Sequence, residues 1–249
     1  MRILFIGDTH GSIDLDKLSE EKVKELQLNN NDVIIHCGDI GVPWNENDLS
    51  VLEYWRNLPC QVIVNLGNHE NYNWIEKQPL IERYGGKGYQ MGENIFAPLI
   101  GEILTVHGKT FWFYPGAYSI DYGYRTLNKS IYTQELPLKV DSDKAVKHLK
   151  EFGQVDVIIS HDGPREFVMR HFGYPIGDVS NAYLEKVQQK RGERVHPGFV
   201  LDEIMKCTDL YDYWYFGHHH KDYEAENIRC LMNQMVLWNI EDNNKEVIS

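Results

Sequence analysis

The chain has 249 residues, of which 42% are hydrophobic and 25% are charged, and its formal net charge is −12. This balance is typical of a globular protein and excludes a disordered or collagen-like chain. The length is sufficient for a full hydrophobic core, so we expect a single domain over residues 1–249. The acidic balance disfavours nucleic acid as a partner, because nucleic-acid-binding surfaces concentrate Lys and Arg and the sequence has no such cluster.

We expect neither export nor membrane insertion from this sequence. Residues 2–6 run directly into Gly7 and Asp8, without the length or the cleavage site of a signal peptide. No apolar run approaches the length of a membrane span, so no membrane partner is expected. The cysteines lie far apart and form no CxxC pair: Cys37, Cys60, Cys207 and Cys230. This spacing favours reduced thiols, and we expect a cytoplasmic protein with these side chains in its core.

The first part of the chain alternates short β-branched runs with amphipathic stretches. The expected elements, in order, are strand 2–6, helix 15–27, strand 32–37, helix 46–57, strand 61–65 and helix 73–83. This alternation is the βαβ pattern of a largely parallel sheet.

The middle and the end of the chain first change this pattern and then resume it. A turn at residues 107–109 joins two expected antiparallel strands, and Ser142 is expected to cap a helix after the polar and aromatic loop 115–137. The expected elements are strands 95–99, 102–106, 110–114 and 155–160, helices 178–189 and 198–206, strand 213–216 and a final meander of strands. We interpret residues 162–212 as a helical insertion or lid, whose role the sequence leaves open together with that of the 115–137 loop.

Five polar motifs each follow an expected strand. They are Gly7-Asp8-Thr9-His10, Gly38-Asp39, Gly67-Asn68-His69-Glu70, Ser160-His161-Asp162 and Gly217-His218-His219-His220. The carboxyl ends of strands in open α/β sheets form the crevice that binds ligands, so we expect these motifs to converge. Oxygen and imidazole ligands without thiolates suit Mn, Fe, Zn or similar divalent ions in an open, catalytic type of site.

The order of these motifs resembles the calcineurin-like metallophosphoesterase superfamily, from residue 7 to residue 220. The resemblance implies an α/β fold: a four-layer sandwich of two mixed β-sheets flanked by helices. It also implies two divalent metal ions, with Mn, Fe, Zn and Ni as the candidates. The implied ligands are Asp8, His10, Asp39 and His220 for one ion, and Asp39, Asn68, His161 and His218 for the other. Asp39 bridges the ions in this scheme, and His219 lies outside the ligand set.

The resemblance further implies the reaction class. Two adjacent cations activate a shared water and neutralise the phosphate, so the expected reaction is hydrolysis of a phosphomonoester or phosphodiester by a dimetal-activated hydroxide. His69, beside the metals, is the expected general acid, and Asp39 is the expected metal-bridging catalytic residue. The expected partner is a small phosphorylated substrate, which bound cations would permit despite the acidic chain.

One departure from the family pattern concerns the phosphate-binding residue. Gly38-Asp39-Ile40-Gly41 lacks the Asp-Arg-Gly that follows this motif in protein serine/threonine phosphatases, so a phosphoprotein substrate is disfavoured. We predict that Arg125 supplies the missing contact to the phosphate, because a guanidinium offers paired donors to its oxygens. A solvent-exposed Arg125 without a role in the site is the competing interpretation.

Two other functions stay open at the level of sequence. The fold can serve as a catalytically silent protein-binding scaffold, which loss of the ligands or of the motif histidine would indicate, although all of them are present here. A nuclease is the other alternative, and it would require a basic groove that the linear sequence does not reveal. The substrate, the native metals and the oligomeric state are not specified by the sequence.

Overall fold

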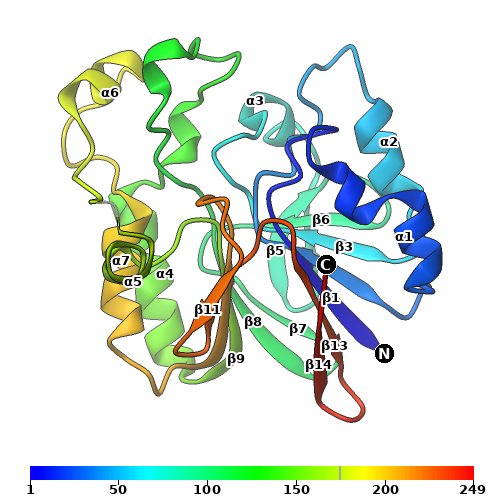
Figure 1. Cartoon of the computed structure of the whole chain (residues 1–249). Helices are drawn as coiled ribbons and strands as arrows, with labels where there is room; N and C mark the ends of the chain where they lie inside the picture. Colours follow the sequence, from blue (N-terminus) through cyan, green and yellow to red (C-terminus); the bar gives the residue numbers. More distant parts are fainter. Residues whose placement is uncertain (174) are drawn as a thin grey trace.

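The computed structural model describes residues 1–173 and 175–249, and its centre consists of two β-sheets (Figure 1). The two sheets share one layer of buried side chains. The first sheet has the strand order β14 (Asn244–Ile248), β13 (Met235–Asn239), β1 (Arg2–Ile6), β2 (Val33–His36), β3 (Gln61–Val64), β6 (Ile95–Pro98), β5 (Gly86–Gln90) and β4 (Leu80–Arg83). Strands β1, β2, β3 and β6 are parallel neighbours, which confirms the parallel sheet expected from the first part of the chain.

The second sheet brings the middle of the chain next to its C-terminal part. Its strand order is β11 (Tyr223–Ala225), β12 (Ile228–Cys230), β10 (Tyr211–Phe216), β9 (Val155–Ser160), β8 (Lys109–Tyr114) and β7 (Ile103–Val106). Strands β8, β9 and β10 are parallel, whereas β7 and β8 form an antiparallel hairpin. His107 and Gly108 connect this hairpin with positive φ angles of 52° and 76°, as a two-residue turn of this kind requires.

Alternating side chains on the strands build the layers of the fold. On β1, Ile3 and Phe5 point into the apolar layer between the sheets, whereas Leu4 and Ile6 point to the opposite face. Helices α1 (Glu20–Glu25), α2 (Ser50–Arg56) and α3 (Tyr72–Ile75) contribute side chains to the cluster on that outer face. Helices α4 (Lys139–Phe152), α5 (Arg165–Phe172) and α7 (Pro197–Met205) cover the outer face of the second sheet (Figure 1). The expected four-layer sandwich of two mixed sheets flanked by helices is therefore confirmed.

The short helix α6 (Asn181–Lys186) packs outside these layers. Its Tyr183 and Leu184 form a small apolar cluster with Ile131 and Leu136 of the 115–137 loop. Two 3-10 turns, Tyr122–Tyr124 and Thr133–Glu135, lie in that loop. The segment 162–212 thus adds α5 and α7 to the helical layer and α6 to this cluster, while its action as a lid and the single-domain assignment stay predictions.

Several expected elements differ in the structure. The expected helix 73–83 is wrong beyond Ile75, because Leu80–Arg83 forms β4 and pairs with β5 after Pro79, which cannot continue a helix. The expected helix 15–27 is divided into a 3-10 turn, Leu15–Leu18, and the shorter α1. Ser142 does not cap α4: it lies inside the helix, where its Oγ is 2.7 Å from the Tyr114 hydroxyl. Helix α5 was not expected from the sequence.

The cysteine side chains are free thiols. Cys37, Cys60 and Cys230 are buried, as expected of core residues, and Cys207 is half-buried. Over residues 1–173 and 175–249, none of the helices combines the length and the apolar character needed to cross a bilayer. The cytoplasmic location stays a prediction.

Candidate metal centre

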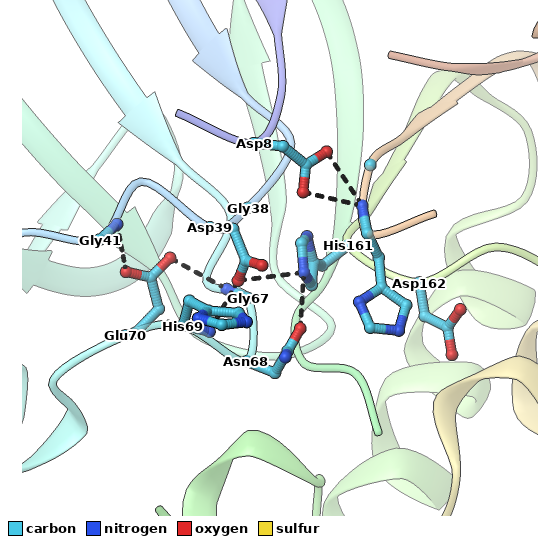
Figure 2. Close-up of polar contacts among 12 residues, drawn as sticks. Asp8, Gly38, Asp39, Gly41, Gly67, Asn68, His69, Glu70, His161 and Asp162 are labelled. Carbon is cyan, nitrogen blue, oxygen red and sulfur yellow. Dashed lines mark hydrogen bonds and ion pairs between the residues drawn. The ribbon is translucent and has the colours of Figure 1, made fainter. Parts of the chain in front are cut away.

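The five polar motifs converge at the carboxyl ends of β1, β2, β3, β9 and β10. Main-chain hydrogen bonds tie the segments together: Asp8 N donates to Gly38 O at 3.0 Å, and Gly217 N donates to His161 O at 3.0 Å. Figure 2 shows the resulting group, in which Asp8, Asp39, Asn68 and His161 from four separate motifs face one another. The convergence expected from the position of each motif after its strand is therefore present in the fold.

Asp39 occupies the centre of this group. Its Oδ1 lies 3.1 Å from His161 Nε2, and its Oδ2 lies 3.3 Å from His10 Nε2. The main-chain N–H of His69 also donates to Oδ1 at 2.7 Å, which holds the carboxylate between the two histidines. The Oδ2 atom is buried and accepts no hydrogen bond. A buried carboxylate oxygen without a hydrogen bond is costly unless a cation binds it.

The predicted ligands form two adjacent groups, each with potential ligand atoms within 4.8 Å of one another. The groups are Asp8, His10 and His220 on one side, and Asp39, His161 and His218 on the other. Asn68 joins the second group, because its Oδ1 lies 3.0 Å from His161 Nε2. The structure thus brings all seven sequence-predicted metal ligands together. Their oxygen and imidazole donors, with the orphaned Asp39 oxygen between the groups, fit divalent cations.

The backbone of this site is unusual. Several predicted ligands have left-handed backbone conformations: Asp8 (φ 50°), His10 (46°), Asp39 (57°), His218 (63°) and His220 (50°). Such φ values are uncommon for residues other than glycine, and clusters of them mark sites where structure is held for function. A Cβ atom on Gly67 would lie 2.1 Å from Asp39 Oδ1, and one on Gly217 would lie 2.3 Å from Asp8 Oδ2. Glycine at these two positions permits the close packing of backbone and carboxylate.

The electrostatics of Asp39 favour positive charge beside it. Burial alone would lower the pKa of His161, but the charge of Asp39 and its hydrogen bond outweigh burial and raise this pKa to about 10. Burial would also lower the pKa of His10, but the nearby carboxylates of Asp39, Asp8 and Asp14 raise it to about 8. Burial would raise the pKa of Asp39, but the neighbouring His161 holds it well below its usual range. Asp39 is therefore ionised, and it stabilises positive charge on both of its sides.

Glu70 organises the loops that carry these ligands. Its buried carboxylate accepts hydrogen bonds from Gly41 N at 3.0 Å and from Gly67 N at 3.2 Å (Figure 2). It also accepts one from Ile40 N at 3.0 Å. One side chain thus links the loop after β2 to the loop after β3. Burial raises the pKa of Glu70 to about 8. Its place in the Gly-Asn-His-Glu motif is a sequence signal for this role, although sequence reasoning assigned Glu70 no function.

His69 lies at the edge of the group and contacts two side chains outside the motifs. Its ring stacks on Trp44, with the ring centres 5.6 Å apart and the planes 22° apart. The Arg125 guanidinium donates from Nη2 to His69 Nε2, and Arg125 is itself buried, with 7% of its surface exposed. Burial lowers the pKa of His69 to about 4. The competing interpretation of Arg125 as a solvent-exposed side chain away from the site is therefore wrong.

The fourth and fifth motifs contain a further contact. His219, which the ligand prediction omits, lies with its Nε2 2.8 Å from Asp162 Oδ1. His219 and Asp162, together with His218, thus form a further group whose potential ligand atoms lie within 4.8 Å of one another, beside the two groups of predicted ligands. Sequence reasoning also omitted Ser119, whose Oγ accepts a hydrogen bond from Asn68 Nδ2 at 3.0 Å.

A two-sheet sandwich with Asp, His and Asn side chains gathered at its strand ends is a metallophosphoesterase architecture. The chain belongs to the calcineurin-like phosphoesterase family, whose model matches residues 1–222. No curated protein matches this chain.

Three solved structures are similar to this chain over nearly its whole length. A novel archaeal phosphodiesterase is 13% identical, with 100% of this chain and 99% of the other covered and a TM-score of 0.46. A second crystal structure is 12% identical, with 100% and 98% covered and a TM-score of 0.53, and this likeness shows the fold. A protein of unknown function from Aquifex aeolicus is 16% identical, with 99% and 95% covered and a TM-score of 0.37.

Proposed function

We propose that this protein is a metal-dependent phosphoesterase that hydrolyses a phosphomonoester or phosphodiester with two bound divalent cations. The membership of the calcineurin-like phosphoesterase family supports the reaction class. The proposed substrate is a small phosphorylated compound, because the net charge of −12 disfavours a long polyanion such as nucleic acid.

The position of Asp39 is the observation that carries this proposal. Its two carboxylate oxygens face His10 and His161, which belong to different ligand groups, at 3.3 and 3.1 Å. A carboxylate that presents one oxygen to each group is suited to bridge two cations. Asp8, His10 and His220 would then complete one coordination sphere, and Asn68, His161 and His218 the other.

The chain's own residues would position the substrate beside these ions. When bound, the two cations would supply Lewis-acid activation of water and neutralise phosphate oxygens. Arg125 lines the same cavity as Asp39, Asn68 and His69, so its guanidinium can reach a phosphate held there. The guanidinium donates to His69 Nε2, so this nitrogen acts as an acceptor and carries no proton in this arrangement. Proton donation by His69 would therefore require that a substrate phosphate first attract Arg125 away from the ring.

The test is metal reconstitution followed by assays on several substrate classes. Chelator-treated protein would be loaded with Mn, Fe, Zn or Ni and assayed with 4-nitrophenyl phosphate, bis(4-nitrophenyl) phosphate and a single-stranded oligonucleotide. We expect metal-dependent hydrolysis of at least one small ester and little cleavage of the oligonucleotide. Two bound metals per chain without hydrolysis of any ester would contradict the proposal and favour a binding scaffold. Preferential cleavage of the oligonucleotide would favour a nuclease.

A further inference from the structure

The cavity at the candidate metal centre extends well beyond the space that a phosphate group needs. Its volume is about 680 Å³, in the range of pockets that enclose whole organic ligands. Asp39, Asn68 and His69 lie at its metal-binding end. Its other walls include residues 118–121, which follow β8, and residues 175–178, which follow α5, together with Asp162 and His196. The part of the substrate attached to the phosphate would lie between these two segments.

The walls of this outer part are largely apolar. Tyr118, Ile120, Pro175 and Ile176 line it. The hydroxyl of Tyr118 already donates to Ser180 Oγ at 3.1 Å, so the ring is the part of this residue that remains for a ligand. Ile120 is 83% exposed at the wall of the cavity, so its side chain is accessible to a ligand. A ligand that covered this side chain would gain from the burial of apolar surface.

The charges of the cavity oppose a second anionic group. Within the part of the chain that the structure describes, Arg125 is the one Lys or Arg that lines the cavity, whereas Asp121 and Asp178 contribute carboxylates to the walls. The Arg125 guanidinium pairs with Asp121 through Nε at 2.7 Å and donates from Nη1 to Ser130 O at 3.2 Å. Asp178 is in turn paired with Arg191 at 2.9 Å. A second phosphate or a carboxylate on the substrate would therefore meet cationic side chains that are already paired with carboxylates.

We infer that the substrate's leaving group is a single uncharged, apolar moiety, bound between Tyr118, Ile120 and Ile176. This inference rests on the proposed function, because it concerns the group that hydrolysis would release. It assigns the enzyme to esters of hydrophobic alcohols or phenols and excludes polyphosphates and substrates with a carboxylate on the leaving group.

The first test compares phosphate esters whose leaving groups differ in size and charge. Mn-loaded protein would be assayed with phenyl, 2-naphthyl and 4-carboxyphenyl phosphate. Phenol and 2-naphthol have similar acidity, so a difference in kcat/KM between their esters reports binding. We expect kcat/KM for the naphthyl ester to exceed that for the phenyl ester at least tenfold. The carboxyphenyl ester has the more acidic leaving phenol, yet we expect its kcat/KM to be at least tenfold below that of the phenyl ester.

A binding measurement separates failure of this inference from failure of the proposed function. Benzylphosphonate and 2-naphthylmethylphosphonate resist hydrolysis, and calorimetry would give their Kd values for the Mn-loaded protein. We expect the naphthyl compound to bind at least fivefold more tightly. This preference without turnover of any monoester or of the diester bis(4-nitrophenyl) phosphate would overturn the proposed function and support the apolar site. Equal kcat/KM values for the three esters, or equal Kd values for the two phosphonates, would overturn the inference.

A pair of isoleucine variants tests the location of the site. Ile120→Asp should reduce the ratio of naphthyl to phenyl kcat/KM at least fivefold, because it places a charge against the apolar group. Because Ile120 is exposed, we expect the substitution to leave the folded structure intact, and a thermal melt of the variant would check its stability. Ile13→Asp is the control, since Ile13 is 78% exposed and does not line the cavity. An unchanged ratio in the Ile120 variant, or an equal fall in the Ile13 variant, would contradict the assignment.

Discussion

Nη2 of Arg125 donates a hydrogen bond to Nε2 of His69, while Nε of the same guanidinium pairs with Oδ1 of Asp121 at 2.7 Å. The guanidinium is thus held beside the proposed general acid, inside the cavity that contains Asp39. A planar group with several donors can keep its pair with Asp121 while another nitrogen turns to a phosphate oxygen. Arg125 and His69 are therefore coupled by a hydrogen bond. Under the proposed function, a phosphate contact of Arg125 would change the proton position on His69.

Replacement of Arg125 should reduce hydrolysis without loss of the metals. Arg125→Lys and Arg125→Ala remove the paired donors. We expect kcat/KM to fall roughly 10-fold to 150-fold, which corresponds to a loss of about 1.5–3 kcal/mol of transition-state stabilisation. Metal analysis should still give two ions per chain. Arg170→Ala is the control, because Arg170 pairs with Glu226 at an exposed position outside this cavity. Unchanged kinetics in both Arg125 variants would place the phosphate contact elsewhere.

The proton-donor role of His69 should depend on the leaving group. His69→Ala should reduce kcat/KM for an alkyl phosphate at least tenfold more than for 4-nitrophenyl phosphate, because the nitrophenolate leaves without a proton. Steady-state kinetics on the two esters would measure this difference. Equal losses on both would indicate that His69 acts through positioning or charge and donates no proton.

Ser119 should fix the orientation of the Asn68 amide. Asn68 Nδ2 donates to Ser119 Oγ at 3.0 Å, which directs Oδ1 to His161 and the second ligand group. Ser119→Ala should therefore weaken metal binding roughly tenfold, since outer partners of metal ligands commonly contribute 10-fold to 100-fold. Ser142→Ala is a matched control: Ser142 is also a buried, hydrogen-bonded serine, but it contacts Tyr114. Equal metal affinity in the two variants, measured by chelator competition, would refute the positioning role.

The buried Glu135 should make stability depend on pH. Burial raises the pKa of its carboxyl to about 8, from an ordinary value of 4.5. The folded protein therefore keeps this proton at higher pH than the unfolded chain, and stability is lost as pH rises from about 4.5 to about 8. Glu135→Gln cannot ionise, so its stability relative to the parent should improve by roughly 2–4 kcal/mol between pH 5 and pH 8. Urea denaturation at both pH values measures this change, and a pH-independent difference would contradict it.

The sequence predicted those parts of the fold and site that depend on local pattern. Apolar runs that end in glycine and a polar residue identified β1, β2 and β3 and placed Asp8, Asp39 and Asn68 at their ends. The β4–β5 hairpin was not predicted, because Leu80–Arg83 alternates between exposed and half-buried positions at a sheet edge. Such a short, weakly buried strand shows little alternation of apolar and polar residues, so its sequence is equally compatible with a helix.

The supporting contacts of the site could not be predicted, because they join residues that are distant in sequence. Ser119 lies 51 residues from Asn68 in the sequence. Glu70 lies 30 residues from Ile40 and 29 residues from Gly41, whose main-chain amides donate hydrogen bonds to its carboxylate. Arg125 was predicted to serve the site on chemical grounds, but its hydrogen bond to His69 depends on how the 115–137 loop folds back. The separation of these residues in the sequence does not indicate that they contact one another, because the contacts depend on the tertiary structure.

The most direct test of the central claim is the metal content and activity of Asp39→Asn. The variant preserves shape but removes the charge that Asp39 presents to both ligand groups, at 3.3 Å from His10 and 3.1 Å from His161. We predict that the parent protein binds two Mn ions per chain and that the variant binds fewer under the same conditions, with hydrolysis of a nitrophenyl ester reduced at least 100-fold. A variant that retained two ions per chain and the rate of the parent would contradict the bridging role of Asp39.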